Sequence, residues 1–163
     1  EDKTIAKRAL SCLIRSIGNL DYFPPPQSIE RLIDALRRKD FPTTSVGKCV
    51  VFVKKEVLWV IPDVRSLPPT YHLANRENLW GRFSLAGPLP PQTYIKPLGA
   101  KGWAEIKSKT KSSLPYRVIC TFPAYWKNEK VMAVPFLFLQ KEKGNYSTFL
   151  YRPKHSLLAE LFV

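Results

Sequence analysis

The chain has 163 residues, of which 26 are Lys or Arg and 13 are Asp or Glu, giving a net charge of +13. A hydrophobic content of 45% is enough for a packed core and excludes an intrinsically disordered chain. No stretch approaches the roughly 20 apolar residues of a membrane span, and we expect no signal peptide. This charge attracts polyanions, and it favours nucleic-acid binding over a basic surface that only keeps the protein soluble.

The first predicted element is a helix over residues 4–17. Gly18 follows its last apolar residue and is predicted as a left-handed cap. The predicted outer face includes Arg8 and Arg15. The predicted buried stripe repeats every four residues and consists of Ile5, Ala9, Leu13 and Ile17, joined by Ala6 and Leu10.

A second helix is predicted after three prolines, with Ser28 as its N-cap and its end near Lys39. Asp34 and Arg38 are spaced for a local ion pair. The charged outer face is either simply solvated or a surface that grips phosphates. Its candidate phosphate-binding residues are Arg31, Arg37 and Arg38, and its predicted buried residues are Ile29, Leu32, Ile33 and Leu36.

A β-hairpin is predicted from two β-branched runs, residues 49–53 and 57–61, with partial cover on both faces. A stiff linker, Ser66-Leu67-Pro68-Pro69, follows it. We therefore predict an α+β protein with two parts. Residues 1–66 form a small helical unit with a β-hairpin, and residues 67–163 form a compact β-rich domain.

The second part is predicted to hold short strands and one short helix, which opens at Gly102. The predicted strands are residues 93–95, 116–120, 131–139 and 147–151. Trp80, Phe83, Trp103 and Trp126 are expected to pack in the core, although each could also stack on a base.

The strongest phosphate-binding candidate lies between residues 96 and 130, where 8 basic and 2 acidic residues occur. The alternative is that these cations only solubilise a helix and its loop. We rank this segment above the helical arginines, because its lysines have only Glu105 nearby in sequence. The candidate residues are Lys101, Lys107, Lys109, Lys111 and Arg117.

Chemistry-bearing motifs are absent from the sequence. The three cysteines, Cys12, Cys49 and Cys120, are far apart, so we expect buried thiols without disulfides and a cytoplasmic protein. His72 and His155 have no ligand-type neighbours, so no metal site is expected. No glycine pair or phosphate-binding loop occurs, and no catalytic residue is proposed.

The order of several short motifs nevertheless resembles a known family. After the helices and the hairpin come Gly81-Arg82-Phe83, Ile95-Lys96-Pro97-Leu98-Gly99, Phe122-Pro123-Ala124-Tyr125-Trp126 and Val131-Met132-Ala133-Val134-Pro135. Together they resemble the C-terminal region of a bacterial tRNA(Ile)-lysidine synthase of the alphaproteobacterial type. The family often has an Asp before the Gly-Arg-Phe motif. Here Leu79-Trp80 precedes it, so only Arg82 carries over as a candidate tRNA-binding residue.

This resemblance implies a tRNA-recognition region whose partners are tRNA(Ile) and its own N-terminal catalytic domain. In the family, that domain uses ATP and Mg²⁺ to attach lysine to the wobble cytidine. No such domain is present in the sequence, so we expect this chain to be a fragment that is inactive alone and binds no cofactor. Two rival interpretations are a standalone basic nucleic-acid-binding protein and a protein–protein interaction domain.

Overall fold

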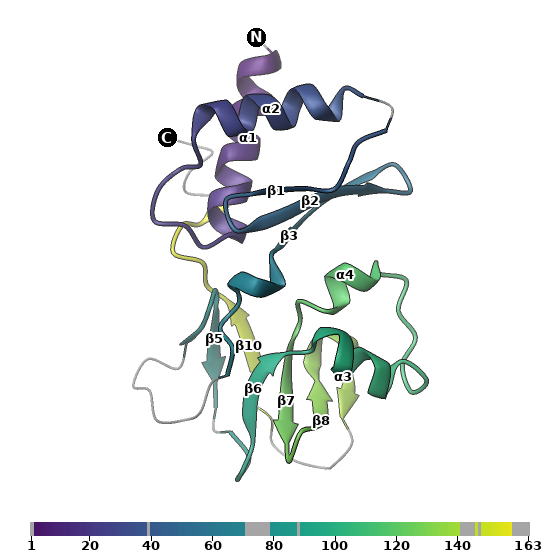
Figure 1. The fold of residues 1–163 in the computed structure, drawn as a ribbon. Helices are drawn as coiled ribbons and strands as arrows, with labels where there is room; N and C mark the ends of the chain where they lie inside the picture. The colour runs from purple at the N-terminus through teal and green to yellow at the C-terminus, as the bar shows by residue number, and fades with distance from the viewer. Residues whose placement is uncertain are drawn as a thin grey trace. The chain divides into compact units, whose positions relative to one another are not determined.

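The computed structural model describes residues 2–38, 40–70, 79–87, 89–140, 146 and 148–157. The chain divides into two compact units (Figure 1). Unit 1 contains residues up to Ser66 and the chain again from Pro153, and unit 2 runs from Leu67 to Arg152. The described residues contain four α-helices and three antiparallel sheets, so the predicted α+β class is confirmed.

Unit 1 packs two helices against one face of a small sheet, as Figure 1 shows. The helices are α1 (Asp2–Ile17) and α2 (Pro26–Leu36), and the sheet has the order β1 (Thr44–Val46), β2 (Cys49–Lys54), β3 (Val57–Pro62). The short 3-10 helix η1 (Val64–Ser66) follows β3. The buried core of this unit is Ile14, Ile29, Leu32, Ile33, Cys49 and Val51.

The stripe predicted for α1 is wrong at its N-terminal end. Ile5 is 64% exposed, and Ala6 and Ala9 are also exposed. The predicted Leu10 and Ile17 do contact the core, together with Ile14, which was not predicted. Each step of four residues turns about 40° past a full helical turn. A strict four-residue repeat therefore winds away from a flat partner, and the i, i+4, i+7 set stays on the sheet.

The end of α1 also differs from the prediction. The left-handed residue is Asn19 (φ 49), and Gly18 does not have a positive φ. Gly18 is needed for close approach, since a Cβ there would lie 2.2 Å from the carbonyl oxygen of Gly47 and 3.3 Å from Sγ of Cys49. Asn tolerates the left-handed region better than most residues, which explains its position after the glycine.

The start of α2 lies earlier than Ser28. Pro26 occupies the first turn, and the carbonyl of Pro25 accepts hydrogen bonds from the backbone N–H groups of Ser28 (2.9 Å) and Ile29 (3.4 Å). Proline suits this position because the first N–H of a helix has no intrahelical partner. Arg37 is the C-cap, so the helix also ends before the predicted Lys39, which lies outside the described residues. The predicted burial of Ile29, Leu32 and Ile33 is confirmed.

The predicted hairpin is confirmed, with longer strands and a tight turn at Lys55-Glu56, where both residues have positive φ. The prediction that both faces of the hairpin are partly covered applies only near its base. Val53, Val57 and Leu58 at the distal end are 44%, 50% and 39% exposed. The hairpin therefore extends beyond the helices that cover its base.

Unit 2 contains two sheets and two short helices. The first sheet has the order β10 (Thr148–Tyr151), β5 (Phe83–Ala86), β4 (Leu79–Trp80). The second has the order β6 (Tyr94–Pro97), β7 (Pro123–Lys127), β8 (Lys130–Val134), β9 (Leu139–Gln140). The helices are α3 (Gly99–Ile106) and α4 (Tyr116–Ile119), and the 3-10 helix η2 (Pro135–Leu137) joins β8 to β9.

Three elements of unit 2 correct the sequence predictions. The strand predicted at 116–120 is α4, because Pro115 starts a helical turn whose carbonyl accepts from the N–H of Val118 at 2.9 Å. The strand predicted at 131–139 breaks at Pro135, which cannot donate to the sheet and opens η2. The helix predicted at Gly102 begins earlier, at Gly99. Of the strand predicted at 147–151, β10 covers 148–151, and Ser147 lies outside the described residues.

Core packing accounts for most of the large aromatic residues. Trp80, Phe83 and Trp126 are at most 8% exposed, and Trp103 packs against the same cluster as Trp126. These four side chains therefore support the fold, as expected. Cys12, Cys49 and Cys120 are buried free thiols, which confirms the prediction made for them.

Candidate nucleic-acid interface

Eight of the nine predicted cations are exposed, and they come from α2 and its C-terminal end, from α3, from the segment between α3 and α4, and from α4. Arg82 is half-buried. Its guanidinium lies 5.3 Å from the centroid of the Phe83 ring, and its carbonyl accepts a hydrogen bond of 2.7 Å from the N–H of Arg152. Arg82 is thus a less accessible candidate than the others. The exposed ones are Lys101, Lys107, Lys109, Lys111, Arg117, Arg31, Arg37 and Arg38.

Backbone hydrogen bonds hold the start of α3 beside the end of α4. The N–H of Leu98 donates to the carbonyl of Phe122 (2.8 Å), and the N–H of Gly99 donates to that of Cys120 (3.0 Å). Gly102 lets α3 approach the sheet closely, because a Cβ there would lie 2.8 Å from the Trp126 ring. These contacts bring the cations of α3 and the Arg117 of α4 onto neighbouring elements (Figure 1).

Lys101 is less isolated than its sequence neighbourhood indicates. Its ammonium group lies 3.4 Å from the carboxylate of Glu129, which comes from the turn between β7 and β8. Lys96 binds the same carboxylate at 3.0 Å, and the hydroxyl of Tyr94 donates to it at 2.5 Å. Glu105, the acidic residue expected beside the lysines, instead accepts a hydrogen bond of 3.2 Å from the N–H of Val131. The expectation that Glu105 is the only nearby acid is therefore wrong for Lys101.

The same network perturbs two titrating groups. The Tyr94 hydroxyl and the ammonium groups of Lys96 and Lys101 lower the pKa of Glu129 from 4.5 to about 2. Burial and the neighbouring carboxylate raise the pKa of Tyr94. Glu129 thus stays ionised at neutral pH and offsets part of the positive charge at this end of unit 2.

The acidic residues of α2 have partners on α1. The carboxylate of Glu30 binds the ammonium group of Lys7 at 2.5 Å. The carboxylate of Asp34, which was predicted to pair with Arg38, lies 3.8 Å from the ammonium group of Lys3. All four side chains are exposed, so each pair contributes little to stability. The arginines on α2 and at its C-terminal end therefore share this helix with two carboxylates, Glu30 and Asp34, which are paired with lysines of α1.

A third group of basic side chains lies around Asp21 in unit 1. The ammonium group of Lys154 binds the Asp21 carboxylate at 2.7 Å, and the Lys154 N–H donates to the side-chain oxygen of Asn19 at 3.0 Å. Lys154 is the main cause of the lowered pKa of Asp21, and Lys48 and His155 lower it further. Lys48, Lys154 and His155 therefore all act on one carboxylate.

Arg15 holds this region together. Its Nη2 donates to the carbonyl of Asp21 at 3.0 Å and lies 3.0 Å from Nε2 of His155. Its guanidinium also lies 4.3 Å from the centroid of the Phe23 ring. Arg15 is partly buried, in contrast to its predicted place on an open outer face. Sequence reasoning missed this cluster because its members come from segments separated by up to 140 residues.

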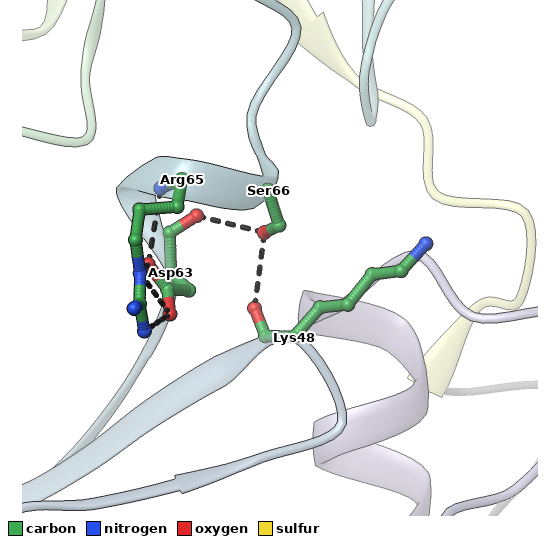
Figure 2. Close-up of polar contacts among 4 residues, drawn as sticks. All are labelled: Lys48, Asp63, Arg65 and Ser66. Atoms are coloured by element: carbon green, nitrogen blue, oxygen red, sulfur yellow. Dashed lines mark hydrogen bonds and ion pairs between the residues drawn. The ribbon is translucent and has the colours of Figure 1, made fainter.

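The main chain of Lys48 is fixed at the point where β3 ends, as Figure 2 shows. Its carbonyl accepts hydrogen bonds from the hydroxyl of Ser66 (3.2 Å) and from the N–H of Asp63 (2.8 Å). Arg65 binds the Asp63 carboxylate with its Nη2 at 2.6 Å and lowers the pKa of that carboxyl. The Lys48 side chain extends away from these contacts (Figure 2).

Neither a metal centre nor a membrane-spanning helix is seen in the part of the chain that the structure describes. No group of three or more His, Cys, Asp or Glu side chains is placed to hold a metal ion there. Within the same residues, no helix is long and apolar enough to cross a membrane.

The described surface is that of a small α+β protein with exposed cations on each of its two units. Comparison with known proteins gives one distant similarity. Over 137 residues, the chain is 23% identical to a tRNA(Ile)-lysidine synthase from Ruegeria pomeroyi. The match covers 80% of this chain and 30% of that protein, so the chain spans about a third of the relative's length. No protein-family model matches the chain, and no solved structure does.

Proposed function

We propose that this chain is the tRNA-recognition part of a tRNA(Ile)-lysidine synthase and corresponds to its C-terminal region. The observation that carries the proposal is the similarity to such an enzyme over 80% of the chain. The net charge of +13 supports it, because an RNA-binding part must offset phosphate charge. The alphaproteobacterial type of the enzyme stays a prediction.

In this proposal the chain binds tRNA(Ile), while ATP and Mg²⁺ are used by an N-terminal catalytic domain with which it works in the cytoplasm. Exposed lysines and arginines on each unit bind phosphates, and these contacts are mainly electrostatic. The shape of the tRNA and a few contacts to base edges or 2′-hydroxyl groups then supply selectivity.

Two surfaces supply the phosphate contacts. The first contains Lys101, Lys107, Lys109, Lys111 and Arg117 in unit 2. The second contains Arg31, Arg37 and Arg38 in unit 1, and Arg82 is an accessory residue. Lys107 and Lys109 are the strongest candidates, since both are exposed and neither has a carboxylate partner among the described residues.

The test is a competition between nucleic acids of equal phosphate content. Labelled bulk tRNA is bound to the protein and displaced by unlabelled tRNA, by a blunt RNA duplex or by a DNA duplex. If the chain is a tRNA-recognition region, unlabelled tRNA should displace the labelled tRNA better than either duplex does. Equal displacement by all three favours the standalone nucleic-acid-binding protein, and absence of tRNA binding at low salt favours the protein–protein interaction domain.

A further inference from the structure

Tyr22 is an exposed aromatic residue with no packing role in the described structure. Its side chain is 85% exposed, and no hydrogen bond or ring contact to another described residue is found for it. An exposed tyrosine offers a flat ring on which a base can stack, and stacking of this kind accepts any base.

The backbone around Tyr22 is held in place. Asp21, on its N-terminal side, accepts a hydrogen bond from Arg15 through its carbonyl (3.0 Å), and Phe23, on the other side, carries the Arg15 guanidinium against its ring. Three prolines follow Phe23 and restrict the chain further. The ring is therefore presented from a segment that loses little freedom on binding, which favours affinity.

Cations from two distant segments act on the carboxylate of Asp21, which precedes Tyr22 in the chain. Lys154 binds the carboxylate of Asp21, the neighbour of Tyr22, at 2.7 Å. Lys48 is exposed, and its backbone is anchored by Asp63 and Ser66 while its side chain extends away from them (Figure 2). Lys48 and Lys154 together outnumber the single charge of Asp21, and the carboxylate of Asp63, near Lys48, is paired with Arg65. The segment that presents the exposed Tyr22 ring therefore carries a net positive charge at its neighbour Asp21.

We propose that Tyr22, Lys48 and Lys154 form a binding site for an unpaired nucleotide of RNA, in which Tyr22 stacks on the base and the two lysines bind neighbouring phosphates. Arg15 is a positioning residue that holds the Asp21–Phe23 segment. The site rests on the proposed function and makes it more specific, because an unpaired base is found in loops and single-stranded ends and not within a regular RNA duplex.

The experiment uses a short single-stranded oligoribonucleotide that carries one 2-aminopurine, whose fluorescence falls when it stacks. The wild-type chain and Tyr22→Phe should both quench it and bind it within about twofold of each other. Tyr22→Ala should lose the quenching and bind about tenfold more weakly, within the range known for single stacked bases. Persistent quenching by Tyr22→Ala, or none by the wild type, would overturn the proposal.

Lys48 has a matched control in Lys55. Both are exposed, both have a positive φ (59° and 52°), and both lie in two-residue turns of the same sheet. Lys48→Asn and Lys55→Asn therefore remove the same charge at a similar, positive φ. Lys48→Asn should flatten the salt dependence of oligonucleotide binding by about 0.7 in log–log slope, the value for one single-strand phosphate, and Lys55→Asn should not. Equal effects would contradict the site.

These experiments distinguish a failure of the nucleotide site from a failure of the proposed function. If the wild type binds bulk tRNA but Tyr22→Ala binds the oligonucleotide as the wild type does, only the nucleotide site is wrong. If the wild type binds the oligonucleotide through Tyr22 but does not prefer tRNA to duplexes, the proposed function is wrong and the site stands.

Discussion

The ammonium group of Lys154 lies 2.7 Å from the carboxylate of Asp21, although 133 residues separate them in sequence. The chain leaves unit 1 after Ser66 and returns to it at Pro153. The contact therefore attaches the returning segment to the loop that follows α1. Arg15 supports it by lying 3.0 Å from His155.

The first prediction concerns this attachment. Lys154→Ala and Asp21→Asn should each speed hydrogen–deuterium exchange in a peptide that covers residues 153–157, because each removes one half of the same contact. The double variant should exchange no faster than either single variant. Additive effects would show that the two residues act separately.

The second prediction compares three substitutions at the end of α1. Gly18→Ala should cost about 1–3 kcal/mol or more in unfolding free energy, since the new Cβ meets the carbonyl of Gly47. Asn19→Ala should cost about 1 kcal/mol because Asn19 has a positive φ, and Asn19→Gly should cost less. Denaturant unfolding measures the order, and a milder effect for Gly18→Ala than for Asn19→Ala would refute the close approach.

The correction at Gly18 shows where sequence reasoning reached its limit. A glycine after an apolar helix predicts the helix end correctly, since only local geometry is involved. Whether that glycine adopts a left-handed conformation or makes room for another part of the chain depends on Gly47, in the turn between β1 and β2, which lies far away in sequence. The same limit applies to Lys101, whose partner Glu129 is 28 residues away.

Short-range periodicity was enough to predict the first two helices, the hairpin and the exposure of the α2 arginines from the sequence. The structure of the 116–120 segment could not be predicted in this way. Tyr116, Val118 and Ile119 favour a strand, whereas Pro115 favours the start of a helix. The segment is helical in the structure, where Val118 and Ile119 are buried. The cluster around Asp21 required knowledge of the tertiary fold.

The third prediction concerns Phe138, which is 99% exposed and has a φ of 53° at the end of η2. Its side chain gains almost nothing from packing, and a bulky residue is disfavoured in this backbone region. Phe138→Asn should therefore raise the unfolding free energy by about 0.5–1 kcal/mol, because Asn accepts this conformation more readily. Thermal and denaturant unfolding provide the measurement, and a loss of stability would mean that the ring is needed.

The fourth prediction is a pH dependence centred on Glu129. Its folded pKa of about 2 lies below its ordinary value of 4.5, so its contribution to stability is present above about pH 4.5 and is lost as the pH falls towards 2. Glu129→Gln removes this titration. The stability of the variant should fall less than that of the wild type between about pH 4.5 and pH 2, whereas parallel curves would contradict the role of Glu129.

The fifth prediction ranks the two candidate phosphate-binding surfaces. Residues 96–130 carry 8 basic and 2 acidic residues, while residues 2–38 carry 7 and 4. A triple Ala variant at Lys101, Lys107 and Lys109 should therefore weaken tRNA binding more than one at Arg31, Arg37 and Arg38.

The salt slope should fall by about 2–3 units in the lysine variant. Lys101→Ala alone should contribute least of the three, because Glu129 already offsets its charge. A larger loss in the arginine variant would make α2 the main binding surface.

The most direct test of the central claim is the salt dependence of tRNA binding by the unaltered chain. If the exposed cations neutralise about 4–6 phosphates, the affinity should fall by roughly two to three orders of magnitude between about 50 and 200 mM salt. Fluorescence anisotropy with labelled tRNA measures this slope. An affinity that does not change with salt would contradict an electrostatic tRNA-binding role.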